Sequence, residues 1–166
     1  MFKSIDIKLP PGPELKFWRK LNRQIQTEVE HKRVTNDTLV EMVKGDIVYM
    51  TTPGDRQAAF AQADAAASAV WAAVMAEPVL AGERGISRTD GYTLIHMHDD
   101  EGVIAGSEGT PIYLSATIAG RGTLTEPLAG FSMIVALLAD ASEYSAVNPF
   151  VWGILGHCCE PSEFVG

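Results

Sequence analysis

The feature that most constrains the fold is a succession of short apolar runs, separated by glycine-containing turns, from residue 38 to residue 155. Several turns carry dipeptides with a strong turn preference, such as Lys44-Gly45, Pro53-Gly54 and Asp90-Gly91. Short strands with turn signals at regular intervals are typical of all-β sandwiches and barrels. We therefore predict an all-β fold, a compact sandwich or barrel of about eight short strands.

The turns also predict which strands pair. Asp90-Gly91 favours a two-residue hairpin between the runs on either side of it. The turn at residues 119–122 predicts a second hairpin. The predicted strands are Leu39–Val43, Asp46–Thr51, Ala69–Ala76, Ile86–Thr89, Tyr92–His98, Pro111–Thr117, Thr123–Glu126, Ser132–Ala139 and Pro149–Leu155.

One segment opposes the β pattern. Residues 58–76 contain eleven alanines among nineteen residues, and alanine is the best helix former. We predict one helical turn around Ala61–Ala67 and a strand from Ala69 onward.

Residues 1–37 differ from the rest and are predicted to form an extended N-terminal arm, with residues 38–166 as the β-rich domain. The stretch Pro10–Pro13 reads Pro-Pro-Gly-Pro, which neither a helix interior nor a central strand accommodates. Apolar residues then recur at spacings of three and four, which predicts a short helix to about Arg23. An extended segment from Ile25 is the alternative, because apolar residues also alternate there.

The charge is divided unevenly along the chain. The net charge is −8, yet residues 1–45 carry nine Lys/Arg against six Asp/Glu, and residues 46–166 carry four against fifteen. An acidic body argues against nucleic-acid binding. A basic arm before an acidic body indicates that the arm contacts something other than its own domain, with chance composition as the alternative.

The sequence predicts neither a membrane protein nor a secreted one. No apolar stretch approaches the roughly 20 residues that cross a bilayer, and the N-terminus lacks an apolar signal region. The two cysteines, Cys158 and Cys159, are adjacent and poorly placed to pair with each other. We interpret them as free thiols of a protein made in a reducing cytoplasm.

Two histidines are the strongest candidates for chemistry. His96 and His98 would point to the same face of a strand and could share a metal ion, with Asp99 or Asp100 as an oxygen ligand. His157, Cys158 and Cys159 could complete such a site. A strand that simply ends in polar residues before an acidic loop explains the pattern better, so no metal site is predicted.

No catalytic or cofactor-binding residue is predicted, and we expect the protein not to be an enzyme. The chain has no nucleophile elbow, because Gly106-Ser107-Glu108-Gly109 matches that motif only superficially. It also has no dinucleotide-binding or phosphate-binding glycine motif.

Part of the sequence resembles small bacteriophage head-decoration proteins, which cement capsids. The resemblance lies in Gly45–Tyr49, in Gly109–Thr125, in Pro127 and Gly130, and in the strand Met133–Leu138 followed by Asp140-Ala141-Ser142. It extends over about residues 38–155. The long arm and the Ala58–Ala67 segment depart from the simplest members of that family.

The resemblance implies a structural virion protein, made in the host cytoplasm, that binds the outer capsid surface and bridges capsid subunits without a cofactor. It implies the major capsid protein as partner and a homotrimer, for which Phe150 and Trp152 are interface candidates. The arm would lie along neighbouring capsid subunits. Its expected partner-binding residues are Phe2, Ile5, Ile7, Leu15, Lys16, Phe17, Trp18, Arg19 and Lys20.

Other functions remain open at this point. Related patterns occur in phage tail and fibre-attachment components. A small metal-binding β-domain that uses His96 and His98 is another alternative, and a β-barrel that binds a small ligand or sugar is a third. Trp18 could also pack on its own domain instead of anchoring the arm in a partner.

Overall fold

A computed structural model describes residues 19–21, 33–52, 54–69, 73–102, 104 and 106–155 of the 166-residue chain. The chain divides into two units, Met1–Lys32 and Arg33–Gly166. In the first unit only residues 19–21 are described, and they are helical, within the segment predicted to form a helix. The remaining predictions for residues 1–32 lie outside the described residues.

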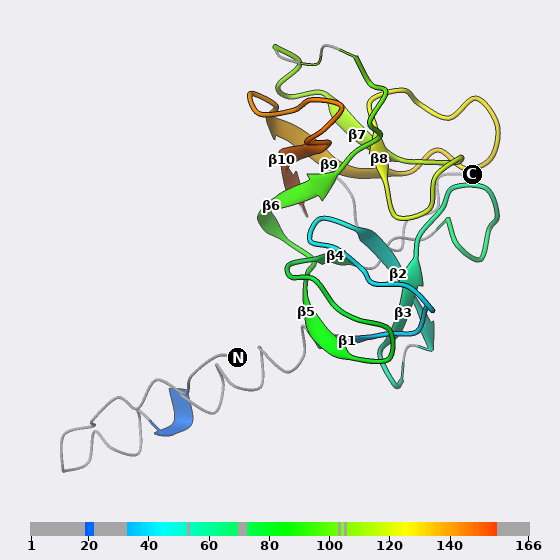
Figure 1. Cartoon of the computed structure of the whole chain (residues 1–166), viewed down its shortest axis with the longest axis vertical. Helices are drawn as coiled ribbons and strands as arrows, with labels where there is room; N and C mark the ends of the chain where they lie inside the picture. The colour runs from blue at the N-terminus through cyan, green and yellow to red at the C-terminus, as the bar shows by residue number, and fades with distance from the viewer. Residues whose placement is uncertain are drawn as a thin grey trace. The chain divides into compact units, whose positions relative to one another are not determined.

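The second unit is all-β, as predicted, and its described residues form ten strands in two sheets (Figure 1). The first sheet closes into a barrel in the order β1-β3-β2-β4-β5, and the second is a five-stranded sheet in the order β6-β10-β9-β7-β8. The strands are β1 (Arg33–Asn36), β2 (Ile47–Thr52), β3 (Gln57–Phe60), β4 (Ala73–Met75), β5 (Arg84–Arg88), β6 (Gly91–His96), β7 (Pro111–Leu114), β8 (Gly122–Thr123), β9 (Ile134–Asp140) and β10 (Phe150–Leu155).

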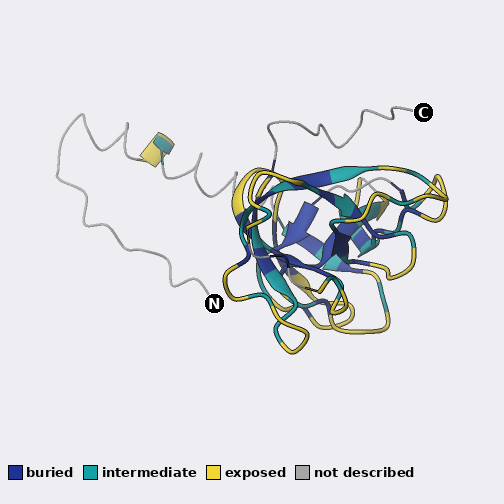
Figure 2. Ribbon diagram, turned by 90° about the horizontal axis from the view of Figure 1, so that it is seen from above, coloured by how far each residue is buried: buried dark blue, intermediate teal, exposed yellow. Residues whose placement is uncertain are grey.

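Two hydrophobic cores hold this unit together, and buried residues, dark blue in Figure 2, gather on the strands. Side chains of β2 and β4 alternate between the cores. Val48 and Ala73 face the barrel interior, while Ile47 and Val74 pack in the second core with residues of the other sheet. Because successive strand residues point to opposite faces, the same two strands line the barrel and join it to the sheet.

The predicted helical turn at Ala61–Ala67 is displaced: residues 61–69 are turns and irregular chain, and a helical-type bond, from the Ala69 N–H to the Ala65 carbonyl at 2.8 Å, lies at the end of the segment. The alanines on either side enter strands instead, with Ala58 on β3 and Ala73 on β4, and both are fully buried in the barrel. The barrel interior requires buried apolar residues on both strands, and Ala58 and Ala73 pack there with larger side chains such as Met42 and Met75. This tertiary requirement outweighs the helix propensity of alanine. Residues 70–72 lie outside the described residues.

The hairpin predicted at Asp90-Gly91 is also wrong. β5 pairs with β1 and β4 in the barrel, whereas β6 pairs with β10 in the other sheet. Gly91 does adopt the left-handed conformation that the dipeptide favours, with φ of 77°. The dipeptide thus fixes a turn, and that turn carries the chain from one sheet to the next. The second predicted hairpin is confirmed, since β7 pairs antiparallel with β8.

The strand boundaries near the arm differ from the prediction as well. Leu39–Val43 is not a strand, and only Met42 of that run forms an isolated bridge, with Val79. Arg33–Asn36, which the sequence placed in the arm, forms β1 and pairs with β3 and β5. The barrel therefore begins at Arg33.

The Gly45-Asp46 pair joins the barrel to the second sheet. Gly45 has φ of 94°, and a Cβ added there would lie 2.9 Å from the backbone nitrogen of His96. That nitrogen donates to the carbonyl of Gly45 at 2.9 Å. The Asp46 carboxylate is 2.7 Å from Nδ1 of His96 and accepts the Val43 N–H at 2.7 Å. Only glycine permits both this conformation and this close approach.

Candidate functional site

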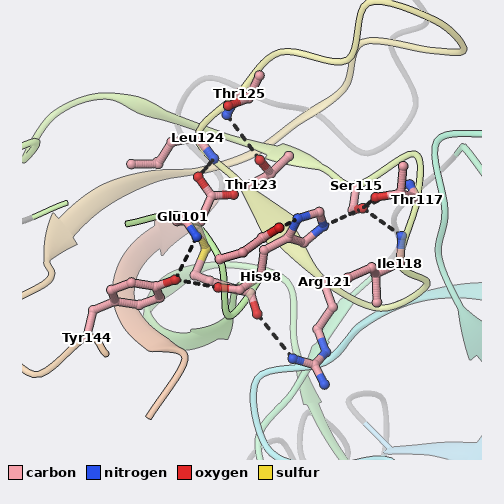
Figure 3. Close-up of polar contacts among 12 residues, drawn as sticks. His98, Glu101, Ser115, Thr117, Ile118, Arg121, Thr123, Leu124, Thr125 and Tyr144 are labelled. Atoms are coloured by element: carbon pink, nitrogen blue, oxygen red, sulfur yellow. Dashed lines mark hydrogen bonds and ion pairs between the residues drawn. The ribbon is translucent and has the colours of Figure 1, made fainter. Parts of the chain in front are cut away.

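An open cleft of about 410 Å³, which we call the histidine cleft, lies in the second sheet, and Figure 3 shows polar contacts of its residues. It lies at the end of β6, against the β7–β8 connection and the segment that follows β8. Its lining residues are His98, Asp100, Glu101, Ser115, Ala116, Thr117, Thr123, Thr125, Glu126, Pro127 and Leu128.

In the cleft a serine contacts a histidine, and the same histidine lies near an aspartate. Nε2 of His98 is 2.6 Å from Oγ of Ser115, and Nδ1 of His98 is 3.5 Å from Oδ1 of Asp100. The order of nucleophile, base and carboxylate is that of acyl-transfer hydrolases. Sequence reasoning missed it because the residues carry no motif and Ser115 lies 17 positions from His98.

Ser115 also has partners in the backbone of the turn that follows it. Ser115 is fully buried, and its Oγ accepts backbone N–H groups of Thr117 at 3.1 Å and Ile118 at 2.9 Å. These two bonds, together with the contact to Nε2 of His98, fix the β7–β8 turn against His98.

The rest of the cleft is also bonded internally (Figure 3). The Tyr144 hydroxyl donates to the carbonyl of His98 at 2.6 Å and accepts the Glu101 N–H at 3.1 Å. Glu101 Oε2 in turn accepts the Leu124 N–H at 3.1 Å. Burial raises the pKa of Tyr144, and nearby carboxylates add to the rise, while the Glu101 N–H opposes it. The polar groups therefore tie together segments that are distant in sequence.

The two histidines considered as metal ligands have separate protein partners. His96 bonds Asp46, and its ring stacks on Phe150 with centroids 4.3 Å apart. His98 bonds Ser115. Within the described part of the chain, no group of three His, Cys, Asp or Glu residues is arranged to hold a metal ion. His157, Cys158 and Cys159 lie outside the described residues.

The second hollow lies on the outward face of the sheet and has a volume of about 230 Å³. We call it the aromatic hollow. It combines two aromatic rings with two carboxylates. Its lining residues are Leu94, Asp140, Ser142, Glu143, Asn148, Phe150 and Trp152.

Strand register explains why these aromatic residues gather. Phe150, Trp152 and Ile154 alternate along β10, and Trp152 lies opposite Leu94 while Ile154 lies opposite Tyr92. Tyr92 stacks on Trp152, with ring centroids 4.8 Å apart and planes 2° from parallel. Tyr92 is 51% exposed and Ile154 40% exposed, so apolar surface continues beyond the hollow. The Lys44 ammonium lies 5.8 Å from the centre of the Trp152 ring.

The polar side of the hollow comes from the β9–β10 connection. Asp140 Oδ1 accepts the Ser142 N–H at 2.8 Å, and the bonds from the backbone and side chain of Ser142 lower the pKa of Asp140. Asn148 Nδ2 donates to the carbonyl of Glu143 at 2.9 Å, which shapes the loop. The hollow therefore presents carboxylate acceptors beside aromatic faces.

The structure brings together only some of the residues that the sequence singled out. Phe150 and Trp152 share the outward face, whereas no sequence pattern indicated that Asp140 and Glu143 line the same hollow. Of the arm residues, Arg19 and Lys20 are described and exposed. The others lie outside the described residues: Phe2, Ile5, Ile7, Leu15, Lys16, Phe17 and Trp18.

Comparison of the chain with protein-family models, with curated proteins and with solved structures finds no match. Among the described residues, no helix has the length and apolar character needed to span a membrane.

Proposed function

We propose that this protein is a structural virion component that binds the outer surface of a phage capsid and stabilises it by bridging capsid subunits. The observation that carries the proposal is the exposed aromatic face of β6 and β10 on a compact β body. A separate basic N-terminal unit supplies a second surface. A chain with two attachment surfaces can contact a copy of itself with one and the capsid with the other.

The structural positions of residues in the stretches that resemble head-decoration proteins also support the proposal. Gly45 and Asp46 join the two sheets, and Ser115 orders the β7–β8 turn. At Gly122 an added Cβ would lie 2.7 Å from the side chain of Ile112. The residues that resemble head-decoration proteins are thus those on which this fold depends.

The physical basis of such a role is linkage. A protein that binds the assembled shell better than free subunits stabilises the shell by mass action. In a homotrimer, three modest contacts act together, because the second and third form at high effective concentration. We propose the major capsid protein as the partner, and the arm as the capsid anchor through the residues from Phe2 to Lys20 named above.

The direct test adds the full chain to capsids that lack it and measures co-sedimentation and the temperature at which the capsids open. We expect saturable binding and a higher opening temperature. A chain that begins at Arg33 should keep its β-rich circular dichroism and its oligomeric state but lose most capsid binding. Truncation at Asn36 would remove most of β1 and confound the result.

Two outcomes would contradict the proposal. If the full chain does not bind capsids, the decoration role is wrong. If the chain from Arg33 binds as well as the full chain, the arm is not the anchor. A tail or fibre-attachment role would instead give binding to tails and not to empty capsids.

A further inference from the structure

Strand β5 of the barrel carries two exposed arginines that do not line the aromatic hollow. Arg84 and Arg88 are both exposed at the two ends of β5, where burial alternates along the strand. Between them Gly85 and Ser87 are buried, and Ile86 is half-buried on the same outward side as the arginines. Residues 46–166 contain four Lys/Arg, and two of them lie on this one strand.

The aromatic hollow has the chemistry that recognises a guanidinium group. A planar guanidinium stacks on aromatic rings and pairs with carboxylates through directed N–H bonds. Trp152 and Phe150 supply the rings, and Asp140 and Glu143 supply the carboxylates. The Lys44 ammonium lies 5.8 Å from the centre of the Trp152 ring, within the distance of a cation–π contact.

The two surfaces lie on different sheets of one body, since β5 belongs to the barrel and β10 to the other sheet. A contact between different surfaces of two identical copies is heterologous, and repetition of such a contact closes a ring when the rotation permits. The bodies carry an acidic net charge, and the two β5 arginines of a second copy are cations that complement the carboxylates of the hollow.

We propose that the aromatic hollow of one copy binds an arginine of β5, Arg84 or Arg88, from the next copy, and that this contact closes the homotrimer. The proposal rests on the trimer of the proposed function and adds the interface and its orientation. Each copy gives one arginine and receives one, so the exposed apolar surface of Tyr92 and Ile154 is covered at the same time.

The test is charge reversal in the full chain, with the oligomeric state measured by sedimentation at several protein concentrations. Glu143→Arg should weaken self-association at least tenfold, because it places a cation against the incoming arginine. Arg84→Glu or Arg88→Glu should do the same. Glu143→Arg should then be combined with Arg84→Glu in one variant and with Arg88→Glu in another. The combination that restores association identifies the arginine that enters the hollow.

Glu108→Arg is the matched control, because Glu108 is exposed and lines neither the histidine cleft nor the aromatic hollow. It should leave association between the bodies unchanged. If neither double reversal restores a trimer that the wild type forms, the interface is wrong while the decoration role stands. A monomeric wild type overturns both the interface and the trimer. A trimer that fails to bind capsids overturns the decoration role alone.

Discussion

The histidine cleft and the aromatic hollow lie on the same sheet and use their polar groups in opposite ways. In the cleft, Ser115, His98, Glu101 and Tyr144 bond one another or nearby backbone. In the hollow, the carboxylates and rings face outward on a continuous apolar surface. We therefore expect the polar groups of the cleft to stabilise the fold and those of the hollow to contact a partner. Changes in the cleft should cost stability, and changes in the hollow should cost association.

The largest loss of stability is expected from Ser115→Ala. The substitution leaves the N–H groups of Thr117 and Ile118 and the His98 imidazole without their buried partner. We expect a loss of about 2–4 kcal/mol in the free energy of unfolding, measured by urea denaturation. Ser132→Ala is the matched control, because it removes an exposed hydroxyl bond to Glu126. If both substitutions lower the free energy of unfolding by a similar small amount, the bonds of Ser115 do not stabilise the fold.

Tyr144→Phe should have the next largest effect. It leaves the His98 carbonyl and the Glu101 N–H unpaired, and we expect a loss of about 1–2 kcal/mol in unfolding free energy. The pKa of Tyr144 is raised from 10.0, so the folded state holds this proton more tightly than the unfolded chain. That contribution is complete below pH 10.0 and is lost as the pH rises through the raised pKa. Denaturation curves at a series of alkaline pH values check this, and a difference between wild type and variant that is already falling at pH 8 would contradict it.

Glu143→Gln distinguishes most clearly between a role in stability and a role in self-association. Glu143 is exposed on a loop, so we expect the unfolding free energy to stay within about 0.5 kcal/mol of the wild type. Self-association should nevertheless weaken, because a charge that faces the partner is lost. Calorimetry measures the stability of the variant, and sedimentation of the same sample measures its self-association. A variant that unfolds much more easily would place Glu143 in the fold and not in an interface.

The smallest effect is expected from Asp140→Asn, and it should depend on pH. The bonds from Ser142 hold the pKa of Asp140 below 3.8, so the charged carboxylate stabilises the folded state at neutral pH. This contribution is present above pH 3.8 and disappears as the pH falls through the lowered pKa. The melting temperatures of wild type and variant should therefore differ slightly at pH 7 and converge in strong acid. A difference that grows in acid would have the wrong sign.

Local patterns predicted the all-β class and the β7–β8 hairpin, because alternation and turn residues act over a few positions. They failed where contacts between distant residues determine the structure. The strands on either side of the alanine-rich segment enter the barrel, and Asp90-Gly91 connects two sheets. Phe150 and Trp152 could be named from β10 alone. Asp140 and Glu143 could not be placed beside them, because a loop conformation set by Ser142 and Asn148 brings them there.

The proposed capsid role is tested most directly by the number of copies of this chain in purified phage particles, measured by quantitative mass spectrometry against the major capsid protein. A capsid-surface protein that bridges subunits should be present in hundreds of copies, in a fixed ratio to the capsid protein. Absence from the particle, or only a handful of copies, would contradict the account.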